Sequence, residues 1–193
     1  MKNLKIQIIA FVLITMAITG KSVSAFSVTV TERVASAVQL YNEGKQDIAI
    51  EDIREVVKNN PDSQRWEVLL AGILIEDAPR KYGFPTPIMA YREPCNLVDR
   101  IKSKGVPSET IKLSTDSNML YAICLSLLGH NKAAIEQFKN IFSGQDVINA
   151  GAYRYGLSVY AIDLISAGRS SEAEELLKNY LEKNGVHQVP LNT

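Results

Sequence analysis

The fold is decided by residues 122–136, which read AICLSLLGHNKAAIE. The same pattern occurs at residues 37–51, AVQLYNEGKQDIAIE, and at residues 161–175, AIDLISAGRSSEAEE. All three stretches carry Ala, Leu, Gly, Ala and Glu at the same positions. Such self-similarity is typical of repeat proteins, in which each copy is one structural unit that stacks on the next.

Each copy predicts a hairpin of two helices. The first Ala and the Leu lie three residues apart, on one helical face, and the Gly follows where helices commonly end. A second helix is expected after the Gly, because the second Ala begins an apolar stripe at helical spacing. Asp47 and Ser171 stand where caps of these second helices are expected. The stripes continue through Ile53 and Val56, Phe138 and Ile141, and Leu177 and Tyr180. Since one hairpin cannot bury its stripe alone, the units are expected to stack.

The copies resemble the tetratricopeptide repeat (TPR) family. The resemblance lies in the Gly at each hairpin turn, the small Ala in each helix, and Asn60-Pro61 after the second helix of the first copy. It implies an all-α fold of stacked antiparallel helix hairpins, an α-solenoid that winds as a right-handed superhelix. It also implies a concave face that binds peptide segments of partner proteins.

A fourth, degenerate unit is expected between the first and second regular copies. At the spacing usual for the family, Ala71 and Leu74 take the repeated positions. The prolines that follow disfavour a second helix in phase, so residues 79–93 are expected to form an irregular insertion. A delayed helix should start at Pro94 and end near Gly105. The predicted architecture is therefore three regular units and one degenerate unit.

The first 25 residues differ from the rest. Lys2 and Lys5 precede an apolar run over residues 8–18, and Val23-Ser24-Ala25 supplies small residues for cleavage. This is the pattern of a bacterial signal peptide cut after Ala25. An uncleaved anchor is disfavoured because a span needs roughly 20 apolar residues. We expect a repeat domain over residues 26–193 that is periplasmic or secreted and has no membrane span after cleavage.

The charge balance argues against a nucleic-acid partner. Removal of residues 1–25 takes away three lysines and no acid, which leaves 18 basic and 21 acidic residues and a net charge of −3. Proteins that bind nucleic acids carry basic surfaces instead. The expected partner is a protein or peptide.

No catalytic, cofactor or metal site is expected. The two histidines, His130 and His187, have no companion ligands at the spacing of a metal site. Cys124 lies in an apolar helical pattern where thiols are usually inert, so it does not suggest a nucleophile with His130 as base. The chain also lacks a glycine-rich phosphate loop and a serine elbow.

The two cysteines, Cys95 and Cys124, leave two interpretations open. In an oxidising compartment they would form a disulfide. Alternatively, Cys124 is only a small buried side chain. Sequence does not give the Cα separation that decides between them.

The resemblance places a largely apolar groove on the first helices of the units. We expect a non-catalytic adaptor of the bacterial cell envelope that binds a partner segment there. One alternative is a structural accessory subunit whose groove is filled by its own Tyr82, Phe84, Ile88 and Tyr91; a less favoured one is an envelope hydrolase. The predicted groove residues are Val34, Val38, Tyr41, Val68, Ile75, Met119, Ile123, Tyr155, Ile162 and Ile165.

Overall fold

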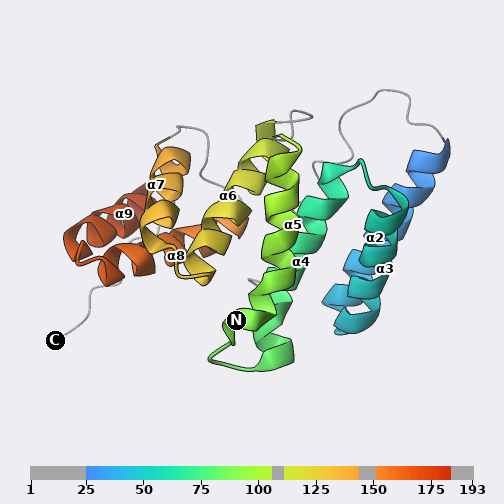
Figure 1. Ribbon diagram of the computed structural model, residues 1–193, viewed down its shortest axis with the longest axis horizontal. Coiled ribbons are helices and arrows are strands. Elements are labelled where there is room, and N and C mark those ends of the chain that lie inside the picture. Colours follow the sequence, from blue (N-terminus) through green and yellow to red (C-terminus); the bar gives the residue numbers. More distant parts are fainter. Residues whose placement is uncertain (1–24, 106–110, 144–150, 184–193) are drawn as a thin grey trace.

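The computed structural model describes residues 25–105, 111–143 and 151–183 (Figure 1). Within these ranges the chain has eight α-helices, one 3-10 turn and no strand, so the all-helical prediction is confirmed. The predicted leader lies outside the described residues except for Ala25, where α2 begins.

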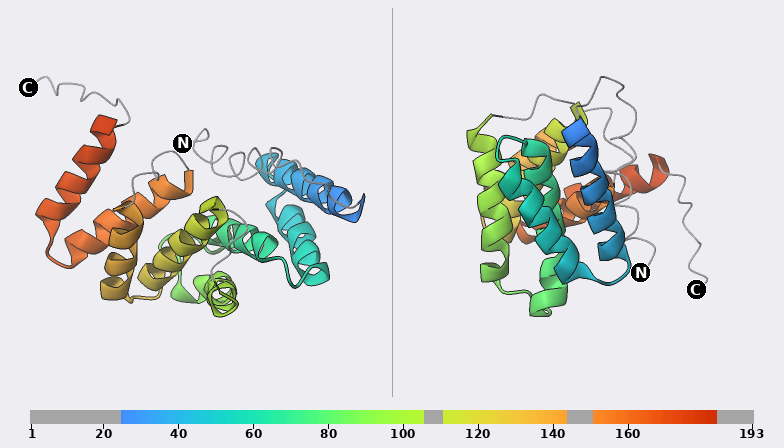
Figure 2. Two further views of the ribbon diagram at one scale, coloured as in Figure 1. Left: turned by 90° about the horizontal axis from the view of Figure 1, so that it is seen from above. Right: turned by 90° about the vertical axis from the view of Figure 1, so that its right-hand side faces the viewer.

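The helices pack chiefly on their neighbours in the chain. Their bounds are α2 Ala25–Asn42, α3 Gln46–Asn59, α4 Gln64–Tyr82, η1 Ile88–Tyr91, α5 Arg92–Ser103, α6 Ile111–Leu127, α7 Asn131–Phe142, α8 Gly151–Ser166 and α9 Ser170–Lys183. The pairs α2–α3, α4–α5, α6–α7 and α8–α9 are joined by contacts of α3 with α4, α5 with α6 and α7 with α8. α6 also contacts both α4 and α8. The helices follow one another along the long axis, from α2 and α3 at one end to α9 at the other, an arrangement consistent with an α-solenoid (Figures 1 and 2).

The repeated Leu and Gly form the hairpin turns. Gly44, Gly129 and Gly168 adopt φ values of 88°, 83° and 75°, a region that side chains with a Cβ disfavour. In each turn the residue after the Gly donates its backbone N–H to the carbonyl of the repeated Leu, over 2.8–2.9 Å. This is the Schellman ending of a helix. The conserved spacing within the three copies is therefore a backbone requirement of the turn.

The core consists of two apolar clusters that meet at α4. Trp66, Leu69 and Ile73 pack with the buried faces of α2 and α3. Ala71 and Ile75, which lie on another face of α4, pack with α5 to α9. α4 is therefore buried on two sides and connects the amino-terminal hairpin to the rest of the described chain.

Cys95 of α5 and Cys124 of α6 lie at disulfide distance, with 5.4 Å between their Cα atoms. Both side chains are buried in the larger cluster. The structure therefore favours the disulfide interpretation, because Cys124 is buried but has Cys95 as a bonding partner and is not only a small core side chain. The link joins the degenerate unit to the next hairpin.

The irregular insertion is shorter than the predicted residues 79–93. α4 continues through Pro79 to Tyr82, and α5 begins at Arg92 rather than Pro94. The last turn of α4 holds Arg80 one turn after Asp77, where the guanidinium bonds both oxygens of the buried carboxylate at 2.5 and 2.9 Å. These contacts offset the backbone hydrogen bond that proline cannot donate. The end of the second helix near Gly105 agrees with expectation.

The predicted caps are also placed differently. α3 starts at Gln46 and α9 at Ser170, so Asp47 and Ser171 lie inside the first turns. Asp47 accepts a hydrogen bond from Arg80 at 2.7 Å instead of capping its own helix. Its role is to tie α3 to α4.

Candidate functional site

Seven of the ten predicted groove residues are buried within the two core clusters. They are Val34, Val38, Tyr41, Val68, Ile75, Met119 and Ile123. Packing inside the protein is sufficient to explain their apolar character. Only the three residues from α8 are exposed, namely Tyr155, Ile162 and Ile165. The structure therefore does not bring the ten residues together on one open surface, and a binding role for the exposed three stays a prediction.

One of the exposed α8 residues, Tyr155, lies close to η1 and α4. Burial, with smaller contributions from the nearby Tyr91 and Glu76, raises the pKa of Tyr155 to about 12. Tyr91 belongs to η1 and Glu76 to α4. Tyr155 and Ile162 are seven residues apart and so share one helical face.

A second apolar surface follows α4. Tyr82, Phe84, Ile88 and Met89 are all exposed, and Phe84 has 94% of its surface accessible. We call residues 82–89 the apolar segment. Of the four residues expected to fill a groove, only Tyr91 is buried. The apolar segment therefore leaves three of those four side chains facing outward.

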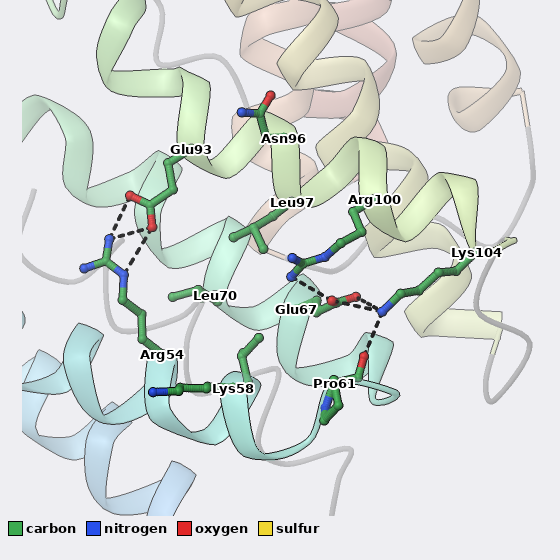
Figure 3. A pocket seen from close by; sticks show the side chains of 11 residues that line it. Arg54, Lys58, Pro61, Glu67, Leu70, Glu93, Asn96, Leu97, Arg100 and Lys104 are labelled. Carbon is green, nitrogen blue, oxygen red and sulfur yellow. Dashed lines mark hydrogen bonds and ion pairs between the residues drawn. The ribbon is translucent and has the colours of Figure 1, made fainter.

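A groove runs along α4 between α3 and α5. Arg54 of α3 crosses it to Glu93 of α5, where its guanidinium donates to both carboxylate oxygens at 2.6–3.1 Å (Figure 3). This ion pair lines two neighbouring clefts. One has a volume of about 750 Å³ and contacts the amino-terminal half of α4; the other, of about 420 Å³, contacts the carboxyl-terminal half.

The larger cleft, here named the cationic cleft, combines apolar and positively charged side chains. Its lining residues are Arg54, Val57, Lys58, Pro61, Glu67, Leu70, Glu93, Asn96, Leu97, Arg100 and Lys104. Four of these are cations and two are carboxylates, so the lining carries a net charge of +2. A positive cleft with low-dielectric apolar walls concentrates field lines and attracts anions.

A buried carboxylate organises one end of the cationic cleft. Glu67 is 1% exposed and lies 2.8 Å from a guanidinium nitrogen of Arg100. Lys104 donates to the same carboxylate at 3.1 and 3.3 Å and to the carbonyl of Pro61 at 2.8 Å. These contacts hold Arg100 of α5 and Lys104, the residue directly after α5, against α4, as the sticks in Figure 3 show.

The smaller cleft has the opposite charge. Asp47, Glu51 and Asp77 line it together with Glu93, whereas its cations are Arg54 and Lys81. We call it the acidic cleft. Tyr82 also lines it, so this cleft adjoins the start of the apolar segment.

Within the described ranges, no group of three or more His, Cys, Asp or Glu side chains could hold a metal ion. Across the same residues, no helix has the length and apolar character required to cross a bilayer. His130 is exposed beside the third hairpin turn, and His187 lies outside the described residues.

Comparison with known proteins supplies no relative. No protein-family model and no curated protein matches the chain. The cationic cleft could not be predicted from sequence because Lys58 comes from α3 whereas Arg100 and Lys104 come from α5 and its C-cap, and all three resemble ordinary solvated charges. The one available signal was Glu67, a carboxylate within the apolar run from Trp66 to Ala71.

Proposed function

We propose that the protein is a non-catalytic protein–protein interaction module that binds its partner through the apolar segment and the exposed face of α8. The observation that carries this proposal is the exposure of Phe84, Ile88 and Met89 on one short segment. Contiguous apolar surface on a soluble protein generally marks an interaction site. Burial of the Phe84 side chain by a partner would contribute about 1.5–3 kcal/mol to binding.

The sequence supports a setting for this activity. The predicted leader favours export to the bacterial envelope, and the cysteine pair at disulfide distance is compatible with an oxidising compartment. The hairpins of three copies resemble TPR units, whose family uses stacked helices to hold partner segments. We therefore propose a TPR-like adaptor of the periplasm or cell envelope.

A structural accessory subunit is a second candidate. The burial of seven predicted groove residues favours it, because those residues are already covered. In that case the partner docks permanently and the protein has no free adaptor state. The two candidates differ in partner exchange, which an adaptor permits and an obligate subunit does not.

Site-specific photo-crosslinking tests the proposal in the native envelope. A benzoylphenylalanine at position 84 or 89 should yield an adduct of defined mass that contains another protein. The same probe at Lys132, an exposed residue of α7, provides the matched control. Absence of an adduct at both test positions, or an equal adduct at the control, would contradict the proposal.

Variants complete this test. Phe84→Ser and Ile162→Glu change exposed residues, so they should weaken partner binding while circular dichroism still reports a helical protein. Val38 is unsuitable for a binding test because it is buried, and a charge there would disrupt the core.

A further inference from the structure

The cationic cleft is a built concavity rather than a gap between loops. α4 contacts both α3 and α5, and Leu70 contributes to the lining from α4. Val57 of α3 and Leu97 of α5 add apolar walls. The volume of about 750 Å³ falls within the range of sites that hold ligands. Three helices therefore form a preformed site with an apolar interior.

Its cations are not neutralised by its own acids. Glu93 is held by Arg54, and Glu67 is held by both Arg100 and Lys104. Lys58 is exposed and has no ion-pair partner within the described part of the chain. Arg100 is about half exposed, and its guanidinium has five N–H donors, more than the single contact with Glu67 uses. Lys58 lies on the α3 side of the cleft and Arg100 on the α5 side (Figure 3).

We infer that the cationic cleft binds an acidic segment of a partner protein, with an apolar side chain against the half-buried Leu97 and carboxylates on Lys58 and Arg100. Charge complementarity selects an acidic ligand, because charge-assisted hydrogen bonds to carboxylates are stronger than neutral ones. The apolar walls select a peptide over a bare inorganic anion, which would leave them uncovered. This inference rests on the proposed function, since it names the partner chemistry of an interaction module.

The position of the cleft supports a peptide occupant. The acidic cleft continues the groove along α4 and ends at Tyr82, where the apolar segment begins. A partner segment can therefore place its acidic residues near Lys104 and continue past Arg54–Glu93 toward Phe84. Asp47 and Asp77 of the acidic cleft are already paired with Arg80, whereas Lys58 of the cationic cleft has no ion-pair partner among the described residues, so the acidic residues of the bound segment are expected in the cationic cleft.

Selection and titration test the inference. A phage-displayed dodecapeptide library panned on the mature protein should enrich sequences in which Asp or Glu adjoins an apolar residue. An enriched peptide, labelled with fluorescein, is then titrated by fluorescence anisotropy. Added salt should weaken its binding, because the cations are partly exposed.

Matched variants locate the binding site. Lys58→Glu and Asn96→Glu change exposed cleft residues without removing a partner of Glu67, and each should weaken the peptide's binding about tenfold or more through the loss of attraction to its carboxylates. Lys132→Glu and Asn140→Glu make the same changes on the exposed surface of α7 and should leave it unchanged. No acidic enrichment, or equal binding by the cleft and control variants, would overturn the inference. Competition by millimolar free glutamate would also overturn it, because the occupant would then be a small carboxylate.

The two proposals can fail separately. If the Lys58→Glu protein still forms the adduct through position 84 with full yield, the interaction module stands and the cleft assignment is wrong. If neither position 84 nor 89 yields an adduct, the proposed function fails. In that case the anisotropy titration alone decides whether the cationic cleft binds an acidic peptide.

Discussion

Reduction of the Cys95–Cys124 bond should lower the free energy of unfolding by about 3.6 kcal/mol. The bond closes a loop between cysteines 29 residues apart in sequence. In the chain-entropy model, opening such a loop returns about 12 cal/mol/K to the unfolded state. This loss is large beside the total stability of a domain, which is about 5–15 kcal/mol.

The assay compares one protein in two redox states. Guanidinium unfolding is followed by helical circular dichroism with and without a thiol reductant, and thermal unfolding should show a fall in Tm of roughly 7–14 °C. The Cys95→Ala, Cys124→Ala double variant is the control, because its transition should not respond to the reductant. Both sulfurs are buried, so the native protein must be reduced in mild denaturant before it is refolded.

Two results would refute this reasoning. One is a difference in unfolding free energy below about 1 kcal/mol between the two states, which would mean that the loop constraint is absent or is offset in the native state. The other is the detection of two reactive thiols per chain in unfolded protein that has never been reduced. That finding would exclude the bond itself.

Three further predictions concern single side chains. Burial raises the pKa of Asp163. The folded state therefore favours the neutral carboxyl more than the unfolded state does, and the contribution of Asp163 to stability is lost as pH rises through its folded-state pKa. Asp163→Asn should raise the free energy of unfolding, measured in urea, by about 1 kcal/mol at pH 7 and by little in acid. Gly156→Ala should lower the free energy of unfolding by about 1–3 kcal/mol, because the new Cβ would collide with the buried side chain of Met119. Gly72→Ala is the control and should be neutral or stabilising, because its Cβ meets only an ordinary contact inside a helix. Equal Tm values for the two variants would contradict this packing. Glu67→Gln should lower the free energy of unfolding by about 1–3 kcal/mol, because it removes the charge that pairs with Arg100 and Lys104. The loss stays moderate because both cations can be rehydrated. An unchanged urea midpoint would show that these ion pairs do not contribute to stability.

The hairpins could be predicted because their determinants are local. The carbonyl of each repeated Leu accepts a bond from the residue after the Gly, so six residues of sequence contain the whole turn. The Gly at its end supplies the positive φ that this geometry requires. Both requirements are visible in any one copy, and the three copies confirm each other.

The course of α4 could not be predicted because its determinants are distant in sequence. Pro79 is a local signal for the end of a helix, yet Arg80 bonds Asp47 across 33 residues and Asp77 within its own turn. Asp47 fits the local pattern of a cap for the same reason, since such a pattern does not reveal a partner on another helix. In the structure Asp47 instead pairs with Arg80 of α4.

The candidate sites show the same limit. The family resemblance directed attention to the first helices, where Val38 and Met119 are core residues. The cationic cleft instead depends on which helices become neighbours, because α3, α4 and α5 each supply only a few charged side chains to it. The spacing of residues within one helix does not show which helices pack against it.

The two apolar clusters that meet at α4 also bear on local unfolding. The amino-terminal hairpin contributes to one cluster only, and the cysteine pair lies in the other. In stacked repeats, stability is approximately a sum of unit and interface terms, so an end unit can open while the rest stays folded. Amide hydrogens of α2 and α3 should therefore exchange with solvent faster than those of α5 and α6. A ligand that bridges α3 and α5 would slow that exchange, so the exchange rate of the amino-terminal hairpin, which lies outside the cluster of the cysteine pair, would report whether the cleft is occupied.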